Sequence, residues 1–203
     1  MELRTLTREE LRRAYERDLC AAFPENELRP LSVLERLCDE GVYEPLAFFE
    51  KDVPVGYAFL WKDADGFLLF DYLAVSESRR GSGLGTELLL SVLDRFGSAP
   101  AIFGEVEGPL GKDAAQDALI CRRLAFYERN GIVKQGYDCG LFGVYYHVLG
   151  KVQPGVSREE LMAHHIAFYK NHLSPERFAR FVQIPVQPGD AIKPFYQDTE
   201  GNP

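Results

Sequence analysis

The sequence lacks the features that would place it in several large classes of protein. No apolar run approaches the roughly 18 to 20 residues that a membrane-spanning helix needs. Acidic residues outnumber basic ones, the formal net charge is −8, and there is no long basic stripe. The four cysteines have neither metal-ligand pairing nor dense disulfide spacing, and they are Cys20, Cys38, Cys121 and Cys139. We therefore expect no metal centre, no membrane span and no nucleic-acid partner.

A secretion signal is also missing from the first residues. They read MELRTLTREELRRAYERD, which is charged and has no apolar core, so we expect a cytoplasmic protein. The acidic balance mildly favours a cationic substrate. The length of 203 residues fits one domain with an extension.

Glycine is concentrated in one stretch, Ser78 to Leu89, which reads SRRGSGLGTELL. The run before it, Phe67 to Val75, is short, aromatic and branched, and it predicts a mostly buried strand. The leucines of Thr86 to Phe96 have helical spacing. The glycines thus join a strand to a helix start, where free N–H groups and the helix dipole attract an anion. A phosphate-bearing ligand fits this arrangement.

The spacing of these glycines excludes two common phosphate loops. A dinucleotide fingerprint requires a third glycine where Thr86 stands, and a P-loop requires a lysine directly after Gly85. The pattern Arg80-x-x-Gly83-x-Gly85, with Gly81 directly after the arginine, instead resembles the acyl-CoA pyrophosphate loop of the GNAT N-acetyltransferase superfamily. The alternative is a glycine-rich turn beside two solvated arginines.

A second motif follows in the order and at the separation that this family has. Ala125 to Gly131 reads AFYERNG and is similar to the F-Y-x-x-x-G segment of the family, so the resemblance covers roughly residues 1 to 150. It departs from the family at Ile120, where many members carry an asparagine that contacts the ligand. The resemblance implies a GNAT-like α/β fold, a mixed central sheet with helices on both faces that is splayed at the acyl-CoA site.

Capping and periodicity predict the other elements. Thr7 and Glu10 form a capping box before a helix that we expect to reach Ala22. We further predict strands at 2–5, 43–49, 55–61, 99–106, 132–137 and 142–149, helices at 32–40 and 118–130, and a turn at 138–140.

After Gly155 the sequence pattern changes from predicted strands to predicted capped helices. We predict a GNAT-like acyl-CoA N-acyltransferase domain over residues 1–152 and a C-terminal helical extension with a tail over residues 153–203. Capped helices starting at Ser157 and Ser174 carry too much apolar surface to leave in water, so they must pack on the core sheet or on a second copy. From Ile184 onward we expect an extended or partly disordered arm.

The resemblance also implies how the acyl donor, acetyl-CoA, would bind. In this family the strand before the glycine loop splays from its neighbour, and its free backbone pairs with the pantetheine arm of the ligand. A backbone N–H there could also stabilise the thioester oxygen. The alternative is that this strand is an ordinary one, hydrogen-bonded to its neighbours in the sheet and not to the ligand. The implied donor contacts are Leu73, Ala74, Val75, Arg80, Gly81, Ser82, Gly83, Leu84, Gly85 and Thr86.

Tyr127 is the strongest catalytic candidate. In the family a tyrosine at this point of the motif gives a proton to the departing thiolate, and a phenol is neutral at pH 7. The alternative is a core tyrosine on an apolar helical face. No cysteine or serine has an activated-nucleophile context, so we expect the amine to attack the thioester directly.

Three carboxylates are candidates for the acceptor side. Alternation places Glu105 and Glu107 on one face of a strand, and Asp71 lies two residues before Leu73. A carboxylate within an apolar strand is costly to bury without a partner, so all three could serve the site. We assign base catalysis to Glu107 and substrate binding to Asp71 and Glu105. The alternative is that they face solvent or pair with arginines on the following helix.

These observations predict an N-acetyltransferase that uses acetyl-CoA, without a metal, to acetylate a primary amine of a small molecule or peptide. The rival function is a non-catalytic acyl-CoA-binding or regulatory module with the same fold. We expect a monomer or homodimer. The segments that would shape the acceptor pocket, Phe23 to Leu31 and Leu141 to Tyr146, have no informative pattern.

Overall fold

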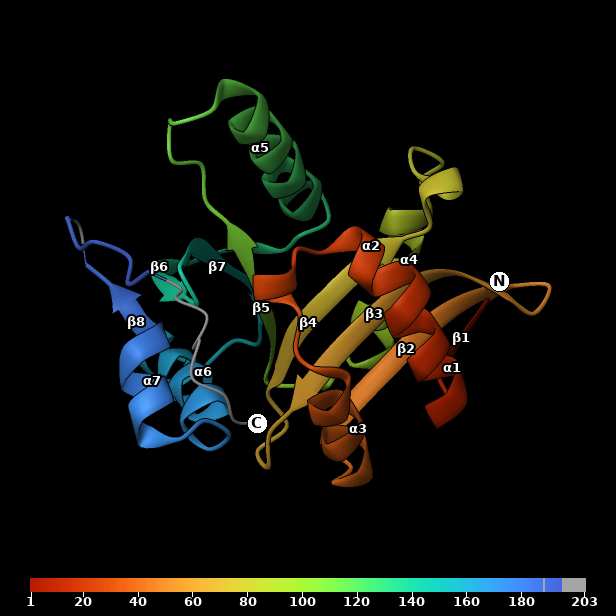
Figure 1. Cartoon of the computed structure of the whole chain (residues 1–203), viewed down its shortest axis with the longest axis horizontal. Helices are drawn as coiled ribbons and strands as arrows, with labels where there is room; N and C mark the ends of the chain where they lie inside the picture. Colours follow the sequence, from red (N-terminus) through yellow and green to blue (C-terminus); the bar gives the residue numbers. More distant parts are fainter. Residues whose placement is uncertain (188, 195–203) are drawn as a thin grey trace.

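The computed structural model describes residues 1–187 and 189–194 and arranges them around one eight-stranded mixed sheet (Figure 1). Its strand order is β1-β2-β3-β4-β5-β7-β6-β8. Neighbouring strands are antiparallel except β4 and β5, which are parallel. The predicted mixed α/β sheet with helices on both faces is confirmed.

Most strands and helices lie where the sequence predicts them. The strands are β1 (Glu2–Thr5), β2 (Tyr43–Glu50), β3 (Val53–Lys62), β4 (Leu68–Val75), β5 (Ala101–Glu107), β6 (Val133–Leu141), β7 (Val144–Val152) and β8 (Val182–Val186). The helices are α1 (Arg8–Ala14), α2 (Cys20–Ala22), α3 (Leu31–Asp39), α4 (Leu84–Arg95), α5 (Ala114–Arg129), α6 (Arg158–Lys170) and α7 (Pro175–Phe181).

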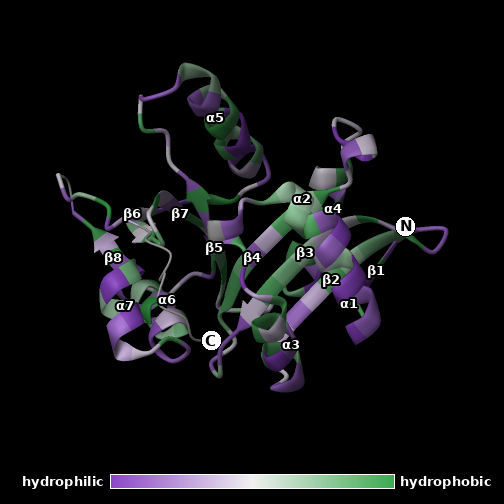
Figure 2. Cartoon of the chain, in the orientation of Figure 1, coloured by the Kyte–Doolittle hydropathy of each residue, from purple (hydrophilic) through white to green (hydrophobic). Residues whose placement is uncertain are grey.

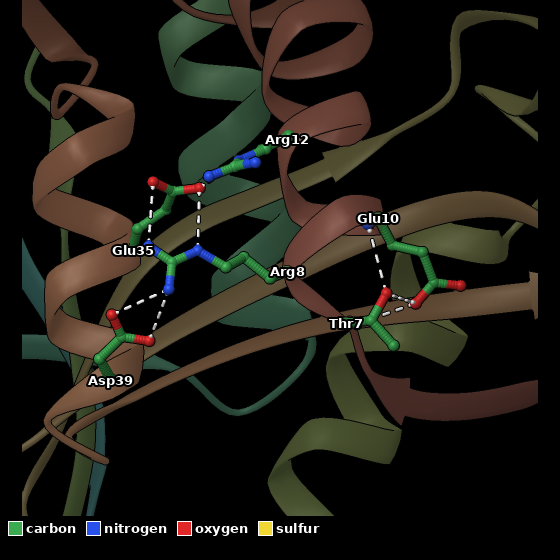
Figure 3. Close-up of polar contacts among 6 residues, drawn as sticks. All are labelled: Thr7, Arg8, Glu10, Arg12, Glu35 and Asp39. Carbon is green, nitrogen blue, oxygen red and sulfur yellow. Dashed lines mark hydrogen bonds and ion pairs between the residues drawn. The ribbon is translucent and has the colours of Figure 1, made fainter.

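The first helix begins at its predicted capping box. The Thr7 side chain accepts a hydrogen bond from the backbone N–H of Glu10, and the Glu10 carboxylate accepts one from the backbone N–H of Thr7 at 2.8 Å (Figure 3). The predicted single helix to Ala22 is interrupted by a π-helical turn over Tyr15–Leu19, which separates α1 from α2. Such turns are rare and often lie near functional sites.

Exposed ion pairs join α1 to α3. Arg8 contacts Asp39 at 3.0 Å and Glu35 at 3.4 Å, and Arg12 contacts the same Glu35 at 2.5 Å (Figure 3). Because both arginines are about half exposed, solvent screens these pairs and each adds little stability. These ion pairs affect the orientation of α3 over the sheet more than the stability of its packing.

The sheet separates two hydrophobic cores. One core packs α1, α3 and α6 against one face, and the other packs α4 and α5 against the opposite face. Figure 2 shows hydrophobic residues concentrated in the central strands and hydrophilic stretches on α1, α5 and α7. No helix in the described part of the chain is long and apolar enough to cross a membrane.

Two predicted boundaries are wrong. The expected turn at 138–140 belongs to β6, and the reversal occurs instead at Phe142 and Gly143, which have φ values of 48° and 86°. Helix α5 begins four residues before the predicted start, because the Asp113 side chain accepts hydrogen bonds from the backbone N–H groups of Ala115 and Gln116. Side-chain capping therefore extended this helix into a segment that resembles a loop.

The C-terminal segment is part of the same sheet and core. Helix α6 starts at the predicted Ser157 capping box, and β8 pairs with β6 as the edge strand. The arm expected from Ile184 is therefore wrong for residues 184–186, which lie in β8, while residues 188 and 195–203 of that prediction lie outside the described residues. In Figure 1 the blue helices α6 and α7 lie beside β6 and β8.

We predict that a chain ending at Gly155 loses thermal stability or aggregates. The truncation removes Leu161, Phe168 and Phe181, which are at most 3% exposed, and it uncovers the Trp61 ring that Phe168 contacts. Thermal unfolding measures the effect. An unchanged melting temperature would show that the segment is an independent appendage.

Two point variants in the full chain test whether the loss of stability comes from lost packing contacts, because neither variant removes a segment of the chain. Phe168→Ala should cost about 3–5 kcal/mol of unfolding free energy, the usual range for a buried phenylalanine. Phe178→Ala is the matched control, because Phe178 is only partly buried and should cost less.

Candidate active site

Strands β4 and β5 form a fork. They pair only at Leu68 with Ile102 and at Leu69 with Phe103, and then diverge. Gly104 stands at the point of divergence, where a Cβ would lie 2.7 Å from the carbonyl oxygen of Phe70. From Phe70 to Val75, β4 bonds to β3 alone and offers no ladder partner to β5. Backbone groups on that side are free to bind a strand-like ligand.

A bulge lies inside the fork. Along β3, Phe59 faces Tyr72 while the next residue, Leu60, faces Phe70, so Asp71 has no opposite residue. A bulge re-aims side chains and disturbs the ladder, and such bulges are common next to active sites. Here it brings the Asp71 carboxylate to the wall of the fork.

The glycine loop lies at the open end of β4. Gly81 and Gly83 have φ values of 78° and 86°, a left-handed conformation that other residues adopt at a cost. Gly83 precedes α4, and no side chain caps the free N–H groups of its first turn. The Arg80 side chain folds back so that Nε donates to the Val75 carbonyl at 3.4 Å. The loop thus presents unpaired backbone N–H groups at a helix start.

A large cavity of about 1770 Å³ connects the fork with its surroundings. It is lined by Arg80 and Val75 near the loop, by β4 and β5 inside the fork, and by Tyr127 on α5. Residues of the loop before α3, among them Phe23, Glu27 and Leu28, also line it, as do Leu141 and Tyr146 near the β6–β7 hairpin and residues of α6 and α7.

Asp71 is held by two partners. Its Oδ2 accepts a hydrogen bond from Arg29 Nε at 2.7 Å and one from the Tyr43 hydroxyl at 2.7 Å. The Arg29 guanidinium also lies over the rings of Trp61 and Tyr169, at 4.6 Å and 5.6 Å from their centroids. Burial lowers the pKa of Arg29, but the charge and hydrogen bond of Asp71, together with Tyr169 and Tyr72, outweigh burial and the net shift is upward. Arg29 therefore stays charged and joins β4 to α6.

Glu105 is held from the C-terminal segment. Its Oε1 lies 2.8 Å from His165 Nε2 and accepts a 2.7 Å hydrogen bond from the Tyr169 hydroxyl. His165 is 0% exposed, and its Nδ1 lies 3.1 Å from the Tyr137 hydroxyl. Burial raises the pKa of Glu105, but the hydrogen bonds and charge of its partners outweigh burial and lower the pKa below its ordinary value. Glu105 is thus an ionised, buried carboxylate.

Tyr127 and Glu107 have fewer polar partners than Asp71 and Glu105. The Tyr127 hydroxyl has no hydrogen-bond partner in the described part of the chain, and burial raises the pKa of Tyr127 to about 12. Glu107 keeps a 24% exposed side chain, and its one ion pair among the described residues is with Arg123 at 3.9 Å. Ile120, at the family's asparagine position, is buried in the core beside α4 and does not line the cavity.

Sequence reasoning missed several residues that line this cavity. Glu27 lies in a single 3₁₀ turn, Glu25–Glu27, and Tyr146 lies on β7 opposite Glu107. Arg29 follows in the same Pro-bearing loop. No local pattern marks a lone glutamate or arginine in a loop as a site residue, because its partners come from distant strands.

Within residues 1–187 and 189–194, one group of side chains could hold a metal ion. Ligand atoms of Asp63, Asp65 and His164 lie within 4.8 Å of one another. His164 Nδ1 lies 2.6 Å from Asp63 Oδ2, and its ring stacks on Phe67 with centroids 3.7 Å apart. These contacts fix α6 to the turn between β3 and β4. The adjacent His164 and His165 point in different directions, His164 to Asp63 and His165 to Glu105.

We predict that His165→Phe makes the protein more sensitive to acid. The lowered pKa of Glu105 stabilises the folded state above the ordinary carboxylate pKa, and this contribution is lost as the pH falls through the lowered value. Without His165 the acid-unfolding midpoint should move to higher pH. Breaking such a buried pair should also cost about 3–5 kcal/mol at neutral pH.

A double-mutant cycle with Glu105→Gln tests the cause. In the Glu105→Gln background, removal of His165 should leave the acid midpoint where it is, because the titrating carboxylate is gone. An acid midpoint unchanged by His165→Phe in the parent would contradict the assignment.

Comparison with known proteins agrees with this geometry. The family model of the acetyltransferase (GNAT) family matches residues 7–116. No curated protein matches the chain. Among solved structures, the fold is similar to that of a protein assigned to the GNAT acetyltransferases from Bacteroides thetaiotaomicron, at 20% identity and a TM-score of 0.67. The match covers 86% of this chain and 100% of that one.

Two further structures share the fold and have named activities. One is the spermidine N-acetyltransferase from Vibrio cholerae in complex with CoA and spermine, at 16% identity, a TM-score of 0.56, and 75% and 95% coverage of this chain and that one. The other is an aminoglycoside 6'-N-acetyltransferase complexed with coenzyme A, at 14% identity, a TM-score of 0.54, and 75% and 97% coverage. Because the family model spans more than half of the sequence, the chain belongs to the GNAT family of acetyltransferases.

Proposed function

We propose that this chain is an N-acetyltransferase that moves the acetyl group of acetyl-CoA directly to a primary amine of a small molecule or peptide. The observation that carries the proposal is the fork, where β4 from Phe70 to Val75 has no partner on β5. The peptide-like amides of pantetheine can pair with that backbone at Leu73 to Val75. The pyrophosphate can bind the backbone N–H groups of residues 81–85, which lie between the hydrogen-bonded N–H groups of Arg80 and Thr86.

The named activities of the neighbours support an amine acceptor. One neighbour is a spermidine N-acetyltransferase and the other an aminoglycoside N-acetyltransferase, and both structures contain CoA. We propose that residues 1–152 bind the donor and that residues 153–203 complete the acceptor side, where Tyr169, His172 and Phe181 line the cavity.

The residues at the fork can divide the chemistry among them. The amine nitrogen attacks the thioester carbon, a C–N bond forms and the C–S bond breaks. A backbone N–H of Leu73 to Val75 stabilises the oxygen as it becomes negative. Glu107 takes the proton that the amine loses, and Tyr127 gives its proton to the departing sulfur. A pKa of about 12 keeps Tyr127 protonated at neutral pH, as this role requires.

Asp71 and Glu105 support the acceptor side. One oxygen of each carboxylate is occupied, whereas the other has no hydrogen-bond partner among the residues that the structure describes. Both residues line the cavity. We propose that the remaining oxygens contribute to acceptor binding.

We predict that Gly83→Val weakens acetyl-CoA binding by at least about tenfold. Open space surrounds Gly83, so the cost comes from its φ of 86°, and a left-handed residue with a side chain costs about 1–2 kcal/mol. The loop would relax away from the conformation that aims its N–H groups. Calorimetric titration of acetyl-CoA measures the effect.

Gly41→Val is the matched control for that titration. Gly41 has a φ of 73° and open space as well, but it follows α3, away from the loop. It should lower stability without weakening acetyl-CoA binding. Full affinity in Gly83→Val would remove the loop from the donor site.

We predict that Tyr127→Phe keeps acetyl-CoA affinity and loses about 10- to 10⁴-fold in kcat, the range for a positioned general acid. The assay is the release of CoA thiol with a panel of primary amines. Tyr145→Phe is the control, because the Tyr145 hydroxyl bonds to Asp138 and the residue does not line the cavity.

The same assay distinguishes the proposed enzyme from the rival function. Tight acetyl-CoA binding without thiol release with any amine would identify a non-catalytic acyl-CoA-binding module. Parent-level turnover in Tyr127→Phe would instead show that water protonates the departing thiolate, and the proposed N-acetyltransferase function would stand.

A further inference from the structure

Two carboxylates and one arginine, Arg123, line the cavity on the side of α5. Glu27, from the turn between α2 and α3, and Glu107, from the end of β5, both line it. Burial raises the pKa of Glu27, the negative charge of Glu107 raises it further, and the positive charge of Arg123 lowers it. Glu27 has no side-chain hydrogen bond to any described residue, and Glu107 forms an ion pair with Arg123 at 3.9 Å. One positive charge therefore faces two carboxylates, which leaves room for one more cation.

Tyr146 completes this group. It faces Glu107 across the β5–β7 ladder, so the two side chains lie on the same face of the sheet. Tyr146 is 9% exposed, and its hydroxyl has no hydrogen-bond partner among the described residues. Every buried side-chain nitrogen or oxygen in the described part of the chain has a partner, so this hydroxyl must reach the cavity surface. An unpartnered hydroxyl beside two carboxylates calls for a ligand that donates hydrogen bonds.

The electrostatics around the Tyr146 ring are negative. Burial raises the pKa of Tyr146, and the charges of Glu27, Glu105 and Glu107 raise it further. Glu105 is engaged by His165 and Tyr169, which leaves Glu27 and Glu107 as the carboxylates with fewer partners near the ring. A ring with carboxylates at its edge suits an ammonium group, which binds both carboxylate oxygens and aromatic faces.

The walls beyond this group are apolar. They come from the hairpin that joins β6 to β7 and from the C-terminal segment, and they include Leu141, Phe142, Val144, Leu173 and Phe181. The Phe142 and Phe181 rings stack, with centroids 5.5 Å apart. A second ammonium group placed against these residues would lose water without gaining a partner. Arg177 also lines this wall, 5.7 Å from the centroid of the Phe181 ring, so the charge found on this wall is positive.

We propose that Glu27, Glu107 and Tyr146 bind the ammonium group of the acceptor, and that this acceptor is a primary amine with a single positive charge on an apolar or aromatic body. The proposal rests on the proposed N-acetyltransferase function and narrows its substrate class. It assigns a binding role to Glu27 and Tyr146. The structure disfavours polyamines, whose additional charges would face apolar residues and Arg177, and amino acids, whose carboxylate would add a third negative charge beside Glu27 and Glu107.

The test compares three amines on the parent protein, with CoA thiol release as the readout: 2-phenylethylamine, spermidine and phenylalanine. We expect kcat/KM for 2-phenylethylamine to exceed the other two by at least tenfold. A preference for spermidine or phenylalanine would overturn the inference while leaving the N-acetyltransferase in place. Turnover of no amine would instead count against the proposed function.

Variants then test the residues by a measurement that does not depend on turnover. Glu27→Gln and Tyr146→Phe should each weaken calorimetric binding of 2-phenylethylamine to the CoA-loaded protein by about tenfold, and acetyl-CoA affinity should be unchanged. Glu128→Gln removes an exposed charge from α5 outside the cavity and serves as the control. Parent-like amine binding in Glu27→Gln and Tyr146→Phe would overturn the assignment.

Discussion

The divergence of β4 from β5 is the constraint on which the rest of the structure depends. In a sheet the backbone N–H and C=O groups normally hydrogen-bond to the neighbouring strand, and a fork leaves these groups unpaired on two facing strands. The fold tolerates the loss because the pairing continues on the outer sides, from β4 to β3 and from β5 to β7. What remains inside the fork is a strip of free backbone beside a helix start, which is an opening that a ligand can fill.

The polar side chains beside the fork follow from the same constraint. Asp71 and Glu105 lie on its two strands, and a carboxylate in that position needs a partner because an unpaired buried charge is very costly. Arg29 supplies the partner for Asp71, and His165 with Tyr169 supplies it for Glu105. The partners come from a loop before α3 and from α6, so two remote segments are tied to the two sides of the fork.

This arrangement explains why the C-terminal segment is inside the core. Helix α6 packs on the same face of the sheet as α1 and α3, and β8 extends the sheet beyond β6. Phe168 of α6 packs against Trp61 on β3 and Phe103 on β5, the strands on either side of β4. The same segment also forms one wall of the cavity, so its packing and its contribution to the site have a single cause.

The sequence by itself determined the local structure and the donor motif. Capping boxes at Thr7 and Ser157 were sufficient to locate two helix starts, because the bonds that make them span only three residues. Glycine spacing was enough to predict the loop before α4, because left-handed backbone at Gly81 and Gly83 is a local requirement. The family resemblance added the expectation of a splayed sheet, which the residues alone did not imply.

Tertiary structure decided everything that depends on partners far apart in the chain. β8 became a strand only because the edge of β6 was available, and the turn after β6 moved to Phe142 because the ladder with β7 continued past Asp138. Glu27 and Tyr146 carry no local signal, since they are separated by more than a hundred residues and meet only across the cavity. Hydrogen bonds within one turn can be predicted from neighbouring residues, whereas the burial and charge of a side chain depend on the whole fold.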